Sequence, residues 1–284
     1  FAVLAESLGT DEKEVLQRTK DLLAEGLIRR FGVSADSRKL GFVSTLVAAR
    51  VRQDRLDAVV AVINSFAEVT HNYERDAEFN VWFTVIARHE RRRQEVLDAI
   101  RAADGVEELI DLPATHVFKI NVQFRLSGKT GGACAPAPPP PEPAAGTQPL
   151  TADPMVLPLL RDLRDDLPVT SRPFAAVAAR FGLAEDDVVA RLQQLKAAGL
   201  VRKLGAFLRH RRVGYSANGM VVWKVAANRV ESVGRQLAAE ARVTHAYARP
   251  ASARWPYRLY TMLHGQSRDE VCAEAARIAR SEER

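Results

Sequence analysis

The chain contains little cysteine and no long apolar run. Two cysteines among 284 residues cannot form a disulfide framework or a multi-cysteine zinc site, and Cys134 lies in a low-complexity stretch. No segment approaches the roughly 18 consecutive apolar residues that a membrane-spanning helix needs, and the opening residues do not resemble a signal peptide. We therefore expect no membrane association and a reducing, cytoplasmic location.

Two other signatures are also missing. The sequence has no glycine-rich loop that would cradle a phosphate group, and no His or Cys spacing typical of a zinc or iron–sulfur site. The net charge is +6, which indicates an anionic partner such as a nucleic acid, a phosphorylated cofactor or a polycarboxylate. Charge alone does not choose among these partners.

The sequence does contain an internal repeat. Residues 1–32 align with residues 174–205 without a gap, and the match continues, with small insertions at predicted turns, from 69–73 to 243–247 and from 79–82 to 257–260. Between the copies, residues 127–154 are rich in proline and alanine and cannot build a core. One fold used twice, joined by a tether, is the simplest interpretation.

Each copy begins with a helix-turn-helix pattern. Apolar residues at helical spacing and acidic first turns predict helices over 1–8 and 11–25 in the first copy. A glycine closes the longer helix in both copies, and we expect a hairpin at 27–33 and at 200–208. This order is typical of a winged helix-turn-helix.

The second part of each copy predicts a βαββαβ, ferredoxin-like module. In the first copy we place strands at 44–51, 69–74, 80–87 and 116–124, and helices at 54–65 and 89–102. The second copy has the same order but reaches Arg284 after its second helix, so we expect its last strand to be missing, as is the first helix of copy one. The predicted fold class is therefore α+β, a tandem repeat arranged as an intramolecular pseudo-dimer. Its expected domains are winged regions 1–43 and 155–214, modules 44–126 and 215–284, and the linker 127–154.

This organisation resembles the Lrp/AsnC regulators, and particular strings resemble the siroheme decarboxylases more closely. The strings are Thr70-His71-Asn72-Tyr73 in the first copy and Trp255-Pro256-Tyr257 in the second. They are similar to the two subunit types of that enzyme, fused in that order as in the heme d1 pathway of denitrifying bacteria. Arg258 departs from the family pattern, since it stands where Asn is expected (compare Asn80).

The resemblance implies removal of the C12 and C18 acetate carboxyls of siroheme, giving 12,18-didecarboxysiroheme. Each such step consumes a proton and releases carbon dioxide, and the tetrapyrrole ring can serve as its own electron sink. No separate cofactor or resident metal is then expected, because the iron enters with the siroheme substrate. The two halves are expected to pair within the chain, and further oligomerisation is left open.

Three kinds of side chain suit this chemistry. Arginine binds carboxylates through paired hydrogen bonds. Histidine can supply a proton near neutral pH, and aromatic side chains can pack against the flat tetrapyrrole ring. We place the candidates mainly in the second copy. The carboxylate-binding candidates are Arg209, Arg211, Arg249 and Lys224; the acid–base candidates are His245, His210, His71 and Tyr247; the ring-binding candidates are Trp255, Tyr257 and Tyr260.

The histidine assignment rests on a repeated spacing. His245 and Tyr247 match His71 and Tyr73, and strand alternation places Val243 and Arg249 on the face of His245. His245 is the preferred acid and His210 the second candidate. A duplicated structural histidine is the alternative, just as a solvated hairpin is the alternative for the basic run around Arg209.

The aromatic residues also have an ordinary alternative, which is the core of a sheet. It applies to Trp223 and Met262 in particular, whereas Trp255, beside Pro256 in a turn insertion, is favoured as a pocket lid. His264 and His116 stand alone among potential ligands and are weak candidates.

A DNA-binding regulator is the main rival function, and a non-catalytic amino-acid sensor or tetrapyrrole carrier is a third. The helix 11–25 carries five acids and three bases, and residues 184–198 carry three acids and two bases. Net negative charge opposes docking into a DNA groove. The charge of these helices therefore disfavours DNA binding.

Overall fold

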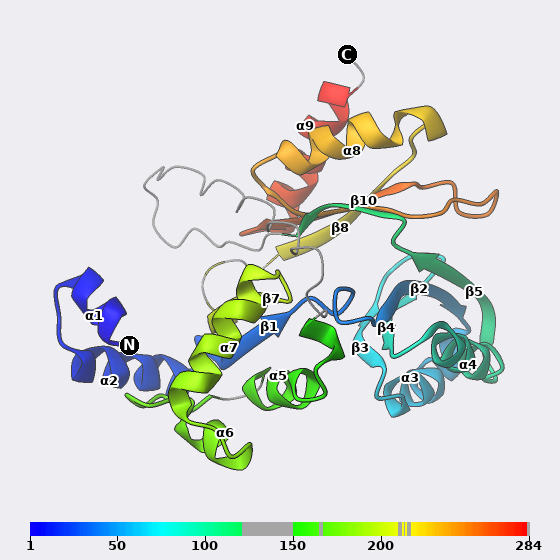
Figure 1. Ribbon diagram of the computed structural model, residues 1–284. Helices are drawn as coiled ribbons and strands as arrows, with labels where there is room; N and C mark the ends of the chain where they lie inside the picture. The colour runs from blue at the N-terminus through cyan, green and yellow to red at the C-terminus, as the bar shows by residue number, and fades with distance from the viewer. Residues whose placement is uncertain (121–149, 165–166, 210–211, 213, 215–216, 283–284) are drawn as a thin grey trace. The chain divides into compact units, whose positions relative to one another are not determined.

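The computed structural model describes residues 1–120, 150–164, 167–209, 212, 214 and 217–282. The predicted linker lies outside them except at its end. The chain divides into two compact units, one made of residues 1–41 and 134–213 and the other of residues 42–133 and 214–284 (Figure 1). Each unit therefore combines a segment from both copies of the repeat. Among the described residues, no helix combines the length and apolar composition that crossing a membrane requires.

The first unit holds the two helix-turn-helix segments. The short and long helices form as predicted in both copies, and the Asp11 carboxylate caps the longer one by accepting from the Glu14 N–H at 2.7 Å. Leucine and valine side chains of α5 and α7 form the buried core of this unit, together with Val33 and Val201. Its elements are α1 (Ala2–Leu8), α2 (Glu12–Ala24), β1 (Ile28–Ala35), the 3-10 helix Leu150–Ala152, α5 (Val156–Arg164), α6 (Ala175–Arg180), α7 (Glu185–Ala197) and β7 (Val201–Leu208).

The predicted hairpins at 27–33 and 200–208 are wrong. Each segment is a single strand, and β1 pairs antiparallel with β7, with Gly32 opposite Gly205. After β1 the chain turns away, because the Asp36 carboxylate accepts from the backbone N–H of Arg38 and of Lys39. Each repeat thus supplies the strand that the other one needs.

The second unit holds both βαββαβ modules, and the first follows its prediction up to the last strand. Its sheet has the order β3-β4-β2-β5, with α3 and α4 on one face (Figure 1). Val47 of β2, Phe83 of β4 and Ile100 of α4 belong to the buried core between sheet and helices. The elements are β2 (Val43–Val51), the 3-10 helix Gln53–Arg55, α3 (Leu56–Ser65), β3 (Val69–Glu74), β4 (Val81–Ala87), α4 (Glu90–Arg101) and β5 (Val106–Pro113).

The second module has the same three neighbouring strands and the same two helices on one face, but its fourth strand lies at the opposite edge of the sheet. Its sheet has the order β6-β9-β10-β8, and α8 and α9 pack on one face of it. Arg258 makes the same kind of contact as its counterpart Asn80: the Asn80 amide donates to the Val51 carbonyl, and the Arg258 guanidinium donates to that of Val225. The elements are β6 (His116–Ile120), β8 (Ala217–Trp223), the 3-10 helix Ala227–Arg229, α8 (Val230–Ala239), β9 (Val243–Ala248), β10 (Leu259–Gly265) and α9 (Arg268–Glu282).

The strand predicted at 116–124 is present over His116–Ile120, and residues 121–124 lie outside the described residues, but its predicted place in the sheet of the first module is wrong. The fourth strand of that sheet is β5, which pairs with β2, whereas β6 crosses to the other sheet and pairs with β9. The sequence did not predict β5, because it contains acidic residues at 107, 108 and 111, and Asp and Glu are depleted in strands. On β6, the Phe118 ring lies against Gly234 of α8, where a glycine leaves room for it.

The two sheets pack face to face within this unit, as expected of an intramolecular pseudo-dimer. We call the buried group between them the inter-sheet cluster. It joins Ala48, Phe79, Trp82 and Leu112 of the first module to Tyr260 of the second, with Tyr247 and Trp255 packed against it. Alternation along β8 places Val222 in this cluster and Trp223 in the helix-facing core, which is the ordinary sheet role allowed for Trp223.

Candidate active site

A β-bulge sets the direction of the candidate acid. Met262 pairs with His245 and the next residue of β10, Leu263, pairs with Val243, so Thr244 is an extra residue in β9. The first module has the same bulge at Thr70. Because a bulge shifts the alternation of side chains, Val243 joins the helix-facing core, and its predicted place on the face of His245 is wrong.

The bulged threonine holds the histidine. The Thr244 hydroxyl lies 3.0 Å from His245 Nδ1 and 3.2 Å from His264 Nδ1, and it donates to the Met262 carbonyl at 3.2 Å. Thr244 is 7% exposed, so these contacts lie largely out of water. In the first module the Thr70 hydroxyl lies 3.0 Å from His71 Nδ1, on an exposed strand.

A row of stacked groups continues from His245 along β9. The His245 and Tyr247 rings stack with centroids 6.0 Å apart. The Arg249 guanidinium lies 5.2 Å from the Tyr247 ring centre and 5.3 Å from that of Tyr260, and it donates to the Leu112 carbonyl of β5. Two tyrosine rings and one carbonyl therefore contact the Arg249 guanidinium, and these contacts restrict its orientation.

Trp255 lies beside this row and joins the two modules. Its indole Nε1 donates to the Tyr260 hydroxyl at 2.7 Å, and its ring contacts Phe79, Trp82 and Tyr257, with centroids 4.9 to 5.4 Å apart. Trp255, the predicted pocket lid, is half-buried and packs against the inter-sheet cluster. Burial raises the pKa of Tyr260 to about 12, against the lowering effect of the Trp255 hydrogen bond and of Arg249.

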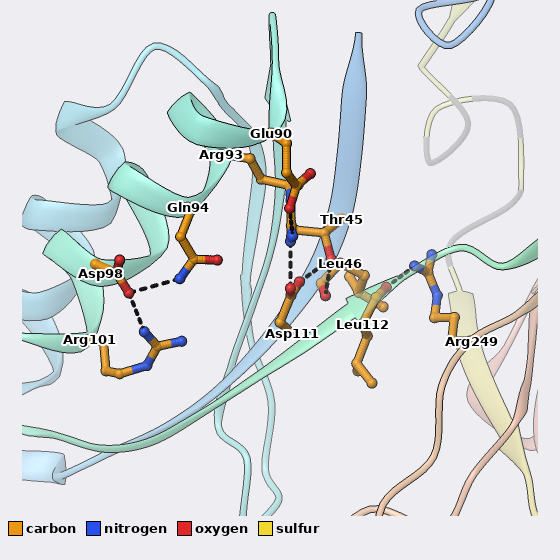
Figure 2. A network of polar contacts seen from close by, with 10 residues as sticks. All are labelled: Thr45, Leu46, Glu90, Arg93, Gln94, Asp98, Arg101, Asp111, Leu112 and Arg249. Carbon is orange, nitrogen blue, oxygen red and sulfur yellow. Dashed lines mark hydrogen bonds and ion pairs between the residues drawn. The ribbon is translucent and has the colours of Figure 1, made fainter.

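A polar network in the first module fixes the strand that carries the Leu112 carbonyl (Figure 2). The Arg93 guanidinium of α4 donates to the carboxylates of Glu90 and Asp111, and the Thr45 hydroxyl of β2 also donates to Asp111. Arg93 and Thr45 are 8% and 2% exposed. Asp111 immediately precedes Leu112, so this network positions the carbonyl that accepts from Arg249.

The structure brings six of the predicted site residues into one connected group in the second module. They are His245, Tyr247, Arg249, Trp255, Tyr257 and Tyr260. Tyr260 is 2% exposed, so it supports Trp255 and Arg249 from beneath, in contrast to the half-buried His245.

Three other predicted residues lie elsewhere among the described residues. Lys224 is exposed just after β8, and His71 is exposed on β3 of the other module. Arg209 belongs to the first unit, where its backbone N–H donates to the Leu27 carbonyl. His210 and Arg211 lie outside the described residues.

Sequence reasoning missed two features of this site. His264 was treated as a lone histidine, although it shares the Thr244 hydroxyl with His245. The sequence carried no local signal for this contact, because the bulge at Thr244 depends on how β9 pairs with β10. The Arg93–Asp111 contact was missed because β5 was missed.

Comparison with known proteins defines the class first. The AsnC-like ligand binding domain family matches residues 39–119 and 212–283, more than half of the chain. The family described as siroheme decarboxylase NirDL-like HTH domain matches residues 1–29 and 158–202. The chain therefore carries two copies of an AsnC-like ligand-binding module with their helix-turn-helix segments.

The relatives then define the particular family. The chain is 32% identical to the siroheme decarboxylase of Hydrogenobacter thermophilus, over 99% of this chain and 82% of that protein. It is 35% identical to the siroheme decarboxylase NirDL subunit of Paracoccus pantotrophus, over 95% of this chain and 81% of that protein. The chain belongs to the siroheme decarboxylase family.

A solved structure agrees with this assignment. The crystal structure of the siroheme decarboxylase NirDL in complex with an iron-uroporphyrin III analogue matches with a TM-score of 0.69 at 27% identity, over 99% of this chain and 81% of that one. The siroheme decarboxylase alpha subunit of Desulfovibrio desulfuricans is 50% identical over 44% of this chain and 72% of that subunit. A single subunit elsewhere thus corresponds to less than half of this chain, as a fused repeat predicts.

Proposed function

We propose that this protein decarboxylates siroheme, removing the C12 and C18 acetate carboxyls to give 12,18-didecarboxysiroheme, and that the residues on β9 of the second module carry out the chemistry. The family assignment supports the reaction, and the related crystal structure contains a tetrapyrrole analogue. The observation that carries the site is the row His245, Tyr247 and Arg249, which sets an imidazole and a guanidinium along one strand.

Arg249 suits the task of holding a carboxylate. A guanidinium is a planar group that matches the geometry of a carboxylate, and in Arg249 its orientation is restricted by the Leu112 carbonyl and by the stacked tyrosines. A substrate with many acid groups needs several such contacts, and we propose Arg209, Arg211, Lys224, Trp255 and Tyr257 as further substrate contacts. Tyr260 is buried, so we propose that it does not touch the substrate and instead positions Trp255 and Arg249, which do.

His245 suits the task of supplying the proton. When the bond between an acetate methylene carbon and its carboxyl breaks, carbon dioxide leaves and the electron pair passes into the tetrapyrrole. A proton from the His245 imidazolium then completes the methyl group, and the histidine is left neutral. Tyr247 stacks on this imidazole and limits its rotation. His71 and His210 remain candidates for a second proton transfer.

The remaining parts of the proposal concern what else the reaction requires. No separate cofactor is proposed, since the ring of the substrate accepts the electrons and its iron arrives with it. Pairing of the modules within one chain, through the inter-sheet cluster, replaces the pairing of two subunits. The low cysteine content supports the cytoplasm as the location.

A direct experiment tests the reaction. Purified protein is incubated anaerobically with siroheme, and the products are identified by mass spectrometry. We expect loss of two carboxyl groups per siroheme. An unchanged substrate mass, at protein concentrations where siroheme binds, would contradict the proposed function.

The regulator alternative has one structural observation against it. The first turn of α7 carries Glu185, Asp186 and Asp187, and Glu185 is paired with Arg172 at 2.7 Å. Such a helix start repels phosphate groups. We expect duplex DNA, titrated in the same buffer, to bind only weakly and without sequence preference.

A further inference from the structure

The Thr244 hydroxyl uses all of its hydrogen-bonding capacity. A hydroxyl has one hydrogen and two acceptor lone pairs. The hydrogen goes to the Met262 carbonyl, because a carbonyl oxygen only accepts. Two acceptor positions remain for the two imidazole nitrogens, His245 Nδ1 at 3.0 Å and His264 Nδ1 at 3.2 Å. With this assignment both histidines carry their hydrogen on Nδ1.

This arrangement gives His264 a definite effect on His245. By occupying one lone pair, His264 holds the hydroxyl with its hydrogen on Met262 and its other lone pair toward His245. His245 is then kept as an Nδ1–H donor, and its Nε2 is the nitrogen that exchanges a proton with a substrate. The neutral form left after proton transfer is the one that the hydroxyl already accepts from.

The first module provides an internal comparison. It has the same bulge and the same contact between Thr70 and His71, also 3.0 Å. The residue that corresponds to His264 is Ile86, since Thr84 pairs with His71 as Met262 pairs with His245. The side chain of an isoleucine cannot donate a hydrogen bond, so among the described residues the second module, and not the first, combines a bulged threonine with two histidines.

We propose that His264 is a positioning residue that fixes the orientation and tautomer of His245 through the Thr244 hydroxyl. This proposal rests on the proposed function, in which His245 supplies the proton. Loss of His264 then slows proton transfer and leaves substrate binding intact. We therefore expect the loss of His264 to lower kcat and not to change KM. A residue that only stabilised the sheet would instead change the thermal stability of the protein, with no specific effect on kcat.

The first test compares four variants by steady-state kinetics. His264→Ile installs the residue found at this position in the first module. We expect it to lower kcat about tenfold and to leave KM unchanged within about twofold. A tenfold loss is smaller than the whole contribution of a general acid, because His245 is still present in this variant. His264→Asn places an amide N–H at the position of Nδ1 and should restore kcat to within about threefold of wild type. Thr244→Val should match His264→Ile, and Thr244→Ser, which keeps the hydroxyl, should have a higher kcat than Thr244→Val.

The double variant decides whether the two residues act together. If His264 acts through Thr244, Thr244→Val with His264→Ile is no slower than Thr244→Val alone. Independent effects, which would multiply to about 100-fold, would overturn the proposal. Wild-type kcat in His264→Ile would overturn it as well.

A second readout does not depend on turnover. The nitrogen-15 shifts of His245 in the labelled full chain report its tautomer, and we expect the Nδ1–H form in wild type and a shift toward Nε2–H in His264→Ile. An unchanged tautomer would refute the positioning role even if the enzyme is active. If the wild-type chain fails to decarboxylate siroheme, the proposed function fails, and the nitrogen shifts still test the contact itself.

Discussion

The indole Nε1 of Trp255 donates to the hydroxyl of Tyr260 across 2.7 Å, at the point where the second module meets Phe79 and Trp82 of the first. Trp255 belongs to an insertion before β10, and Tyr260 to the inter-sheet cluster. This one hydrogen bond therefore links a loop of the candidate site to the core that joins the two repeats.

The first prediction concerns the pH dependence of stability. Burial raises the pKa of Tyr260 to about 12, above its unfolded value near 10. The folded state keeps the phenol proton that the unfolded state loses, so the free energy of unfolding should fall between pH 10 and pH 12, by about 2 kcal/mol. Denaturant titrations at several pH values measure this slope.

Tyr260→Phe provides the control for that slope. The variant lacks the ionisable group, so the part of the pH dependence due to Tyr260 should disappear. A constant offset at all pH values is also expected, because Trp255 loses its acceptor. Identical slopes in wild type and Tyr260→Phe above pH 10 would show that this phenol is not buried as described.

The second prediction concerns the Arg93 network in Figure 2. Arg93→Met leaves the Asp111 carboxylate, which also accepts from Thr45, without its charged partner. We expect a loss of about 2–3 kcal/mol in the free energy of unfolding, because removing one member of a largely buried pair exposes the other to an uncompensated desolvation cost.

Arg101→Met on the same helix is the matched control. Arg101 pairs with Asp98 on the exposed surface, and such pairs contribute about 0–1 kcal/mol. Equal destabilisation by Arg93→Met and Arg101→Met, measured by chemical denaturation, would argue against a special role for the buried network.

The third prediction tests the position of β6, which follows the first module in sequence but belongs to the sheet of the second. Gly234 lies in helix α8, where alanine would ordinarily stabilise by about 1 kcal/mol. A Cβ at this position would meet the Phe118 ring of β6 at 2.3 Å. We therefore expect Gly234→Ala to destabilise the protein by about 1–3 kcal/mol, as overpacking does.

Combining this change with Phe118→Ala should reverse its sign. In the Phe118→Ala background the space is open, and Gly234→Ala should then stabilise by about 1 kcal/mol. Thermal or chemical denaturation of the four proteins completes the cycle. If Gly234→Ala is stabilising in both backgrounds, β6 does not pack on α8.

The repeat, the helices and seven strands of the two modules could be predicted from the sequence, because their apolar periodicity is strong and most of it occurs twice. Strand β5 could not, since Glu107, Glu108 and Asp111 interrupt its apolar pattern. The pairing of β6 with the second sheet and the pairing of β1 with β7 could not be predicted either. The local pattern of residues does not say which repeat supplies the partner of a strand.

The candidate site shows the same division. The spacing of His245, Tyr247 and Arg249 predicted a common face, and the structure confirms their alignment. The bulge at Thr244 moved Val243 off that face, and it brought His264 to the same hydroxyl. A bulge depends on pairing with β10, so the spacing along β9 alone could not reveal it.

The central claim is that His245 supplies the proton for siroheme decarboxylation, and the rate of didecarboxysiroheme formation by His245→Ala tests it most directly. His116→Ala is the matched control, because His116 pairs opposite Ala248 in the same sheet and its ring lies against Phe118, away from the row on β9. We predict that His245→Ala lowers the rate at least about 100-fold while siroheme still binds, as loss of a general acid does, and that His116→Ala keeps the wild-type rate. A wild-type rate in His245→Ala would contradict the account.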